Sequence, residues 1–402
     1  MKPLEGIRVV EAAMYGFVPS AGAVLAEWGA DVVKIEHAVT GDPQRGLRRT
    51  GTFVIEDGEP NPNIEHANRG KRSIGLDMSN PEGLEVLHEL VRDADVFLTS
   101  FLPSARRRFR IDVEDIRAVN PKIVYARGSA LGPRGPEAEK GGYDMTAFWA
   151  RASTAASITP EGTDGVLSAP VPAYGDTISG TNLAGGVAAA LLKRERTGEP
   201  SVVDVSLLGS GVWAMGHGIA LARLKKQPWV MAPPGAQRAY ANPLTMLYRT
   251  ADGRHISLVM LQPTRYWADV CRHVGLDHLV DDRRFATADS IAEHSQEAVA
   301  ALQEAFGSRP LAEWTRILAT LSGPWAPVQD SVQVGDDPQV VANGYLRRVG
   351  DLELATGPVQ FETETPDPTP APEFAAQTEE VLLELGFDWD RILALKAAGA
   401  VT

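Results

Sequence analysis

One aspartate stands where a proline-containing approach gives way to a long run of small residues. Residues 170–175 read PVPAYG, Asp176 follows, and glycine or alanine then occupies positions 180, 184, 185, 188, 189 and 190. Lys193, Arg194 and Arg196 come next, with Gly198 just beyond them. Basic residues in a last turn followed by glycine are typical of a helix end. The pattern therefore predicts a helix from near Asp176 to near Gly198.

Asp176 has two interpretations at that position. As an N-cap, its carboxylate would accept hydrogen bonds from free backbone N–H groups, and the positive end of the helix dipole would keep it ionised. Alternatively, the small residues bring this helix against a neighbouring backbone or a ligand, and Asp176 is a reactive carboxylate at that contact. The stretch by itself leaves both interpretations open.

The elements that would position Asp176 alternate between strands and helices. Short β-branched runs predict strands at residues 7–12, 31–36, 73–77, 95–100, 123–127 and 202–206, with helical patterns between them. This alternation predicts an α/β fold with a mostly parallel sheet covered on both faces. The first strand is not followed by Gly-x-Gly-x-x-Gly, and no Gly-x-x-x-x-Gly-Lys-Ser/Thr loop is present, which argues against a dinucleotide or NTPase site.

The character of the chain changes near Lys225. Residues 225–242 contain three prolines and no clear period. Two strand-like runs follow at 246–250 and 255–260, joined by Ala-Asp-Gly-Arg, which predicts a hairpin. Helical stretches come after the hairpin, and a proline-rich passage lies at 363–372. We expect a smaller α+β domain in this part of the chain.

Composition excludes several classes of function. The chain has 402 residues, 44% of them apolar, and a net charge of −13, which argues against nucleic acid or an anionic membrane as a partner. A single cysteine, Cys271, fits a reducing cytoplasm, and no apolar run or signal peptide points elsewhere. The eight histidines show no metal-ligand spacing, so no metal site is expected.

Two basic clusters and one short turn are further candidates. Lys71 and Arg72 precede a predicted strand, and residues 106–108 and Arg110, all arginine, follow another. Ligands gather at strand ends in such sheets, so these clusters suggest a phosphate-bearing ligand, with a solvated basic face as the alternative. Tyr143 and Asp144 end the turn Gly-Gly-Tyr-Asp, in which the aspartate is either a helix cap or a site residue.

Several stretches, taken together, carry a family resemblance. LEGIRVVEAA (4–13), AGAVLAEWGADVVKIE (21–36), NRGKRSIGLDMSNPEG (68–83), DVFLTSFLPSARRR (95–108), GGYD (141–144), AYGDTISGTNLAGGVAAALL (173–192) and DDPQVVANGY (336–345) resemble the class III CoA-transferase family. This family is also called the CaiB/BaiF or formyl-CoA transferase family. The resemblance runs through nearly the whole chain in the same order, but it does not identify a substrate.

The resemblance implies a reaction and a set of site residues. Asp176, in the Gly175-Asp176 step, would attack an acyl-CoA thioester to give an aspartyl–acyl anhydride and then an aspartyl-CoA thioester, from which an acceptor carboxylate takes CoA. Tyr143 and Asp144 would stand near the thioester. CoA would be a substrate rather than a tightly bound cofactor, and its pantetheine arm, phosphates and adenine would meet Tyr15, Gly16, Phe17, Val18, Lys71, Arg72, Phe101 and Arg108.

The resemblance also implies an architecture. We expect a Rossmann-like large domain that begins with residues 1–224, a small α+β domain with linkers at 225–330, and a C-terminal segment at 331–402 that returns to the large domain. Two chains would form an interlocked, ring-like homodimer.

Two departures from the family limit the choice of activity. Racemases of the family have histidine where Tyr143 stands, and tyrosine is a poor base at neutral pH, which favours CoA transfer. The glycine-rich loop of the formyl-CoA branch is reduced to Gly235 within 231–242, so formate and oxalate are not expected. An α-methylacyl-CoA racemase or a lyase on the same scaffold remains the alternative, followed by a CoA-binding protein without catalysis.

Overall fold

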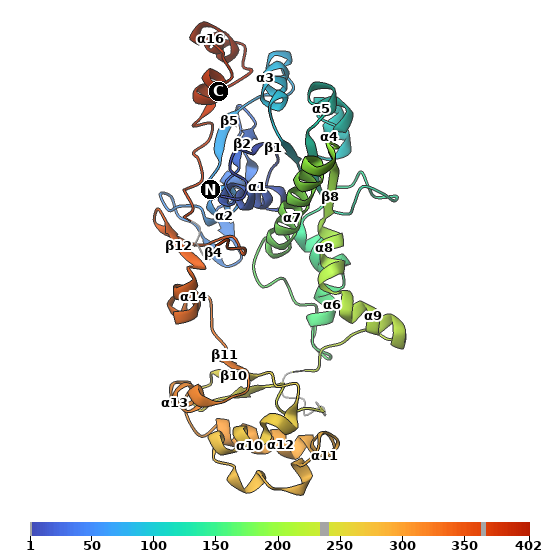
Figure 1. Cartoon of the computed structure of the whole chain (residues 1–402), viewed down its shortest axis with the longest axis vertical. Coiled ribbons are helices and arrows are strands. Elements are labelled where there is room, and N and C mark those ends of the chain that lie inside the picture. The colour runs from blue at the N-terminus through green and yellow to red at the C-terminus, as the bar shows by residue number, and fades with distance from the viewer. Residues whose placement is uncertain (1, 234–240, 363–366) are drawn as a thin grey trace. The chain divides into compact units, whose positions relative to one another are not determined.

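The chain forms two compact units in the computed structural model, which describes residues 2–233, 241–362 and 367–402 (Figure 1). The larger unit comprises residues 1–231 and 339–402, and the smaller unit comprises residues 232–338. Gly235 and residues 363–366 of the proline-rich passage lie outside the described residues.

A six-stranded sheet forms the centre of the larger unit. Its strands lie in the order β5-β2-β1-β6-β7-β8, and every neighbouring pair is parallel, so the predicted mostly parallel sheet is confirmed. The strands are β1 (Arg8–Ala12), β2 (Asp31–Glu36), β5 (Arg72–Gly75), β6 (Val96–Thr99), β7 (Val124–Ser129) and β8 (Val202–Ser206). Because all six run the same way, their carboxyl ends share one edge of the sheet.

Helices cover both faces of this sheet, and each face has its own core. The alternation of side chains along β1 sends Val9 into one core and Val10 into the other. The Val9 core includes α1 (Phe17–Glu27) and α7 (Tyr174–Thr197). The Val10 core includes α3 (Pro81–Arg92), α5 (Val113–Val119), α15 (Thr378–Glu384) and α16 (Trp389–Ala397). The C-terminal helices thus pack on the same sheet as the N-terminal strands (Figure 1).

Shorter elements complete the larger unit. They are η1 (Pro43–Gly46), β3 (Arg49–Thr50), β4 (Phe53–Val54), α2 (Pro62–Asn68), α4 (Pro103–Phe109), the π-helix η2 (Met145–Arg151), α6 (Thr154–Ile158), α8 (Leu207–Ala214), α9 (Gly216–Lys225), α14 (Pro338–Asn343), β12 (Leu346–Val349) and β13 (Leu352–Ala355). The π-helix follows the Gly-Gly-Tyr-Asp turn, and π-helical turns are frequent near functional sites.

Helix α7 lies unusually close to α1 because its facing residues are small. A Cβ atom on Gly180 would stand 2.7 Å from the Cβ of Ser20 and 2.8 Å from the carbonyl oxygen of Phe17. Since those contacts include backbone, no side chain fits at position 180 at this separation. The run of small residues therefore brings the start of α7 against the start of α1.

The start of α7 corrects the prediction that Asp176 is its N-cap. The helix begins at Tyr174, its N-cap is Ala173 with φ +59°, and Asp176 is the third helical residue. The backbone N–H of Gly175 donates instead to the carboxylate of Asp144 at 3.2 Å. A carboxylate from another segment thus takes up a free donor of the first turn, and Asp176 keeps its own carboxylate for other contacts.

The smaller unit is an α+β structure with its own core. Strands β9 (Leu247–Arg249) and β10 (His255–Leu258) form the predicted antiparallel hairpin, and β11 (Trp325–Pro327) pairs with β10. Around them lie α10 (Pro263–Val274), η3 (Asp277–Leu279), η4 (Arg283–Phe285), α11 (Ala288–Glu293), α12 (Ser295–Phe306), α13 (Leu311–Ile317), η5 (Leu318–Thr320) and η6 (Gln333–Asp336). The core includes Trp267, Trp314 and Cys271.

No helix in the described ranges 2–233, 241–362 and 367–402 combines the length and hydropathy needed to cross a lipid bilayer.

Candidate active site

A cavity of about 740 Å³ opens at the carboxyl edge of the parallel sheet. Its walls come from segments that follow β1, β6 and β7, from the start of α8, from residues 137–146 and from α7. The segment after β1 contributes Met14, Tyr15 and Phe17, and the segment after β6 contributes Phe101. The cavity therefore lies where open α/β sheets bind their ligands.

Asp176 lines this cavity from the first turn of α7. A Cβ atom on Gly16 would lie 2.7 Å from Oδ2 of Asp176, so the carboxylate rests directly against the backbone of the Tyr15–Gly16 turn. Gly16 is also the N-cap of α1. The carboxylate consequently lies beside the amino end of α1 while belonging to the amino end of α7.

Gly175 and Asp144 shape the environment of the Asp176 carboxylate, the first by close packing and the second by its charge. A Cβ atom on Gly175 would meet the Phe148 side chain at 2.5 Å, so only glycine lets α7 begin this close to the π-helix. Burial, followed by the charge of Asp144, raises the pKa of Asp176 from 3.8 to about 7. Burial also raises the pKa of Asp144. The expectation that the helix start keeps Asp176 fully ionised at neutral pH is therefore wrong, because the carboxylate loses water and faces a second acid.

Tyr15 and Tyr143 form an aromatic wall of the cavity. Their rings meet edge to face with centroids 5.4 Å apart. Tyr15 has φ +65°, an uncommon conformation for a bulky residue. A hydrogen bond with the Tyr143 hydroxyl, together with burial, raises the pKa of Tyr15. Both side chains line the same cavity as Asp176.

Phe17 and Val18 take different places. Phe17 lines the cavity, whereas Val18 is buried and packs against Gly128 of β7, where a Cβ atom would stand 2.4 Å from Val18 Cγ2. Of these two predicted contacts, the structure brings only the Phe17 side chain to the cavity.

A second cavity of about 170 Å³ adjoins the first and shares Met14 and Phe101 with it. It lies between the ends of β2, β5 and β6 and is also lined by His37 and Phe109. The guanidinium of Arg108 lies over the Phe109 ring, 4.5 Å from its centroid. Phe101 and Phe109 thus line the smaller cavity, and the exposed Arg108 lies over Phe109.

Comparison with known proteins identifies the family. The model of CoA-transferase family III matches residues 4–378. The chain belongs to CoA-transferase family III.

Named relatives and solved structures agree with this membership. The chain is 31% identical to (R)-2-hydroxy-4-methylpentanoate CoA-transferase of Clostridioides difficile over 99% of both chains. It is 29% identical to cinnamoyl-CoA:phenyllactate CoA-transferase of Clostridium sporogenes over 97% of this chain and 95% of the relative. Rv3272 of Mycobacterium tuberculosis superposes with a TM-score of 0.77 at 29% identity, covering 94% of this chain and 98% of that one. The fold also matches a CaiB/BaiF family protein of Brucella suis, with a TM-score of 0.80 at 24% identity over 96% and 99% of the two chains. This protein is therefore an acyl-CoA:carboxylate CoA-transferase.

Two predicted phosphate contacts of this CoA-transferase need correction. Lys71 is buried, and its ammonium donates to both oxygens of Glu11 at 2.9 and 2.8 Å, to the Pro19 carbonyl at 2.8 Å and to Asn68 Oδ1 at 3.1 Å. An ammonium has three N–H donors, so these acceptors satisfy it fully. Lys71 stabilises the interior of the larger unit and has no donor left for a phosphate.

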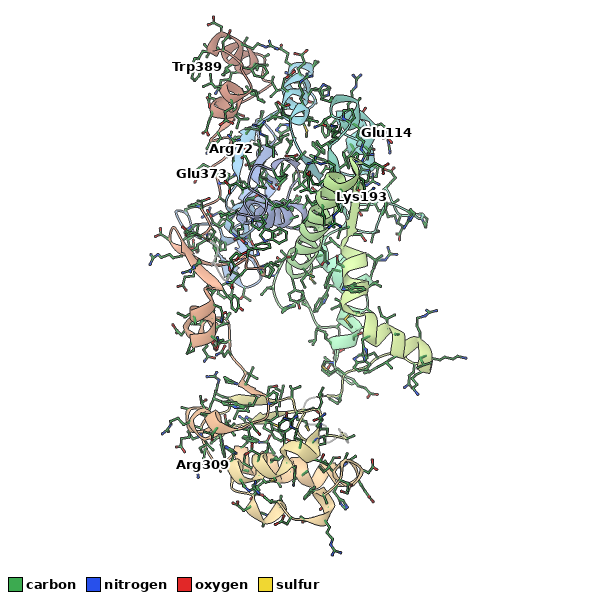
Figure 2. All side chains as sticks on the ribbon, viewed as in Figure 1. Arg72, Glu114, Lys193, Arg309, Glu373 and Trp389 are labelled. Carbon is green, nitrogen blue, oxygen red and sulfur yellow. The ribbon has the colours of Figure 1, made fainter. Side chains whose placement is uncertain are left out.

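Arg72 lies at the wrong edge of the sheet for a cavity ligand. It is the first residue of β5, at the amino end, where it pairs with Asp31 at 2.6 Å and with Glu384 of α15 at 2.7 Å. Figure 2 shows its side chain on the side of the larger unit that carries the C-terminal segment. Basic character alone, without the direction of the strand, led to the wrong assignment.

Of the predicted arginine cluster at 106–110, Arg106 is the member that lines the larger cavity, whereas Arg127, Glu137 and Asp204, which also line it, were not predicted. Arg127 of β7 pairs with Asp204, its register partner on β8. Arg106 is buried and pairs with Asp112 at 3.1 Å, while Glu137 pairs with Lys140 at 2.8 Å and with Arg151. Arg127 and Asp204 stand near the ends of predicted neighbouring strands, and that position was the only signal for them in the sequence.

We expect Asp176→Asn to stabilise the protein above pH 7. The folded-state pKa is raised to about 7, whereas an unfolded aspartate titrates near 4. The wild type therefore loses stability as pH rises through this interval. Each pKa unit corresponds to about 1.4 kcal/mol, which limits the gain at pH 8 to about 4 kcal/mol, with little gain at pH 4. Urea unfolding of the wild type and the variant at pH 4 and pH 8 measures the gain in unfolding free energy at each pH.

Asp77→Asn provides a control of opposite sign. Hydrogen bonds from Ser79 lower the pKa of Asp77, so that carboxylate contributes stability that is present at high pH and lost as pH falls. Asp77→Asn should thus destabilise the protein at pH 8. A gain for Asp176→Asn that does not change with pH would contradict the raised pKa.

Proposed function

We propose that this CoA-transferase uses Asp176 as its nucleophile and carries CoA from an acyl-CoA to a carboxylic acid through covalent aspartyl intermediates. The observation that carries the proposal is the position of the carboxylate. It lines a ligand-sized cavity, rests against the Gly16 backbone and has its pKa raised to about 7. A nucleophile with a pKa near the working pH is both ionised in part and basic enough to react.

The proposed steps balance without ATP or an oxidant. An Asp176 oxygen attacks the thioester carbonyl carbon, the C–S bond breaks, and CoA thiolate leaves an aspartyl–acyl anhydride. The thiolate then attacks the aspartyl carbonyl, releasing the donor acid and forming an aspartyl-CoA thioester. The acceptor carboxylate attacks this thioester, and the thiolate returns to the acceptor's carbonyl, which regenerates Asp176. Covalent catalysis of this kind divides one difficult exchange into easier steps.

The surroundings of Asp176 suit this chemistry. The amino end of α1, capped by Gly16, supplies free N–H groups and positive potential beside the carboxylate, where negative charge develops on the attacked carbonyl oxygen. We assign Asp144 to hold the first turn of α7 through the Gly175 N–H and to raise the basicity of Asp176 by its charge. Gly175 permits the close start of the helix.

The racemase and lyase alternatives receive less support. A two-base racemase needs a second group that exchanges a proton near neutral pH, and histidine is the usual one. No histidine is among the described residues that line the cavity of Asp176. The Tyr143 side chain is largely exposed and packs edge to face on Tyr15.

We propose that CoA lies along both cavities, with its acyl end at Asp176. The Tyr15–Gly16 turn and Phe17 would face the pantetheine arm, and Phe101 would mark the passage between the cavities. Arg108, held over Phe109, is the cation that we assign to a phosphate group. This arrangement keeps the nucleophile at the apolar end of the ligand and the guanidinium at its charged end.

We also propose that two chains assemble, as the family resemblance implies. Helix α9 buries none of its own side chains within the chain, and Trp213 and Leu224 are 84% and 72% exposed. Large apolar side chains in this number are usually covered by a partner, and an interlocked second copy would cover them. The unpaired Cys271 fits a cytoplasmic location.

The names of relatives suggest which acids to test first. They include branched and aromatic 2-hydroxy acids as well as succinate and glutarate. We propose that the acceptor belongs to one of these two groups of carboxylic acids.

Trapping the covalent intermediate tests the proposed function. Incubation with an acyl-CoA donor and hydroxylamine should convert Asp176 to a hydroxamate, which peptide mass mapping would locate. Asp176→Ala should lose CoA exchange by a factor of about 10³ or more, as expected when a nucleophile is removed. Near-normal turnover of Asp176→Ala, or rapid deuterium entry at the α-carbon of a 2-methylacyl-CoA without any adduct, would instead favour the racemase alternative.

Arg108→Ala should weaken CoA binding, measured by calorimetry, by about 10- to 100-fold. Charge-assisted hydrogen bonds contribute about 1.5–3 kcal/mol each, which corresponds to that factor. Arg72→Ala is the matched control and should leave the dissociation constant unchanged, because Arg72 lies at the amino edge of the sheet. Equal losses in both variants, or none in Arg108→Ala, would overturn the phosphate assignment.

A further inference from the structure

A cluster of buried charges lies behind the Tyr15–Gly16 turn. Glu11, Lys34, Asp42 and Lys71 are each at most 6% exposed. Burial pulls the pKa of Lys34 down, but the nearby Asp42, Glu11 and Glu36 carboxylates raise it above its ordinary value overall. Lys34 therefore remains charged, and its ammonium requires hydrogen-bond acceptors in fixed places.

The hydrogen-bond and ion-pair partners of Lys34 hold the turn at two points. Its Nζ lies 3.0 Å from the carbonyl oxygen of Ala13, 2.9 Å from Asp42 Oδ2 and 3.3 Å from Glu11 Oε1. On the other side of its carboxylate, Asp42 Oδ1 accepts from the backbone N–H of Tyr15 at 3.3 Å. Lys34 thus holds the Ala13 carbonyl directly. It holds the Tyr15 N–H indirectly, through the carboxylate of Asp42.

Three further hydrogen bonds hold Asp42 and the turn. The backbone N–H of Gln44 donates to Asp42 Oδ1 at 2.9 Å, and that of Asp42 donates to Glu36 Oε2 at 2.8 Å. The N–H of Met14 donates to Ser100 Oγ at 3.1 Å. The orientation of Asp42 is therefore fixed independently of the turn that it holds.

The held turn is strained and stands in direct contact with the proposed nucleophile. Tyr15 has φ +65°, a conformation that an aromatic residue adopts only when its surroundings impose it. The next residue, Gly16, packs so closely on Asp176 that a single added carbon would lie 2.7 Å from Oδ2. A relaxed turn would move the backbone that faces the carboxylate and admit water beside it.

We propose that Lys34 and Asp42 are positioning residues for the reaction at Asp176, because they hold the Tyr15–Gly16 backbone against its carboxylate. The inference rests on the proposed function of Asp176. Lys34 lines neither cavity, and Asp42 lines only the smaller one, so both act on Asp176 through the turn. Lys71 belongs to the same cluster, but its bonds to Glu11, Pro19 and Asn68 do not reach the turn.

Steady-state kinetics of Asp42 variants test the proposal. Asp42→Ala should lower kcat by about 10²-fold, the loss expected from misplacing a reacting group by about 1 Å. Asp42→Asn keeps an oxygen that can accept from Tyr15 and should lose only about 10-fold. Lys34→Met should lower kcat by a similar factor, with KM for the acyl-CoA changed by less than about threefold, because Lys34 lines neither cavity.

The pH profile separates positioning from general stability. In the wild type the acid limb of kcat/KM should follow Asp176 near pH 7, and hydration of the carboxylate should move that limb to lower pH in Asp42→Ala. Arg69→Met is the matched control, because Arg69 forms a buried ion pair with Glu27, away from the turn. It should lower the unfolding temperature while leaving kcat and the pH limb unchanged.

The outcomes are distinguishable. An unchanged kcat in Asp42→Ala, or an equal loss of kcat in Arg69→Met, would overturn the positioning role. If Asp42→Ala does not fold, kcat of Asp42→Asn is compared with kcat of Arg69→Met instead. An unchanged kcat in Asp42→Asn, or an equal loss in both variants, would overturn the positioning role. A wild type that forms no Asp176 hydroxamate fails the proposed function itself, whereas a wild type that forms it with Asp42→Ala equally active fails the positioning role alone.

Discussion

The arrangement of the larger unit keeps the Asp176 carboxylate out of water, against the Tyr15–Gly16 turn and near Asp144. Burial and the charge of Asp144 both disfavour ionisation of Asp176 and raise its pKa to about 7. Close contact with Gly16 is what excludes water on one side. A folded protein gains no stability from such an arrangement at neutral pH. We attribute this cost in stability to the reactivity that we propose for Asp176.

Each layer of the fold contributes to that contact. The parallel sheet brings the segments after β1, β6 and β7 to one edge, where the cavity forms. Small residues on α7, Gly180 above all, set the distance between α7 and α1 and thus between Asp176 and Gly16. Behind the turn, the buried Lys34 and Asp42 hold a strained backbone in place. Packing, backbone conformation and buried charge therefore all maintain the contact between the Asp176 carboxylate and the Gly16 backbone.

Local sequence patterns predicted the sheet, the hairpin of the smaller unit and the helix that carries Asp176, because periodicity and turn chemistry act within a few residues. These local patterns did not predict which residues, distant in the sequence, form ion pairs or hydrogen bonds with one another. Lys71 reads as a basic loop residue, yet its carboxylate partner Glu11 lies 60 positions earlier in the chain. Arg72 reads the same way, yet its partner Glu384 lies 312 positions later. The first turn of α7 was misassigned for a similar reason, since Asp144 comes from a separate segment.

Oxygen tracing tests the central claim, which is that Asp176 itself exchanges its carboxylate oxygen with the substrates. With an acceptor acid labelled with ¹⁸O in its carboxylate, the proposed steps leave one labelled oxygen on Asp176 after a turnover. Peptide mass mapping should then find a gain of about 2 Da at Asp176, and the label should pass to the donor acid in those later turnovers in which the labelled oxygen attacks the thioester. Turnover without label in the Asp176 peptide would contradict covalent catalysis by this residue.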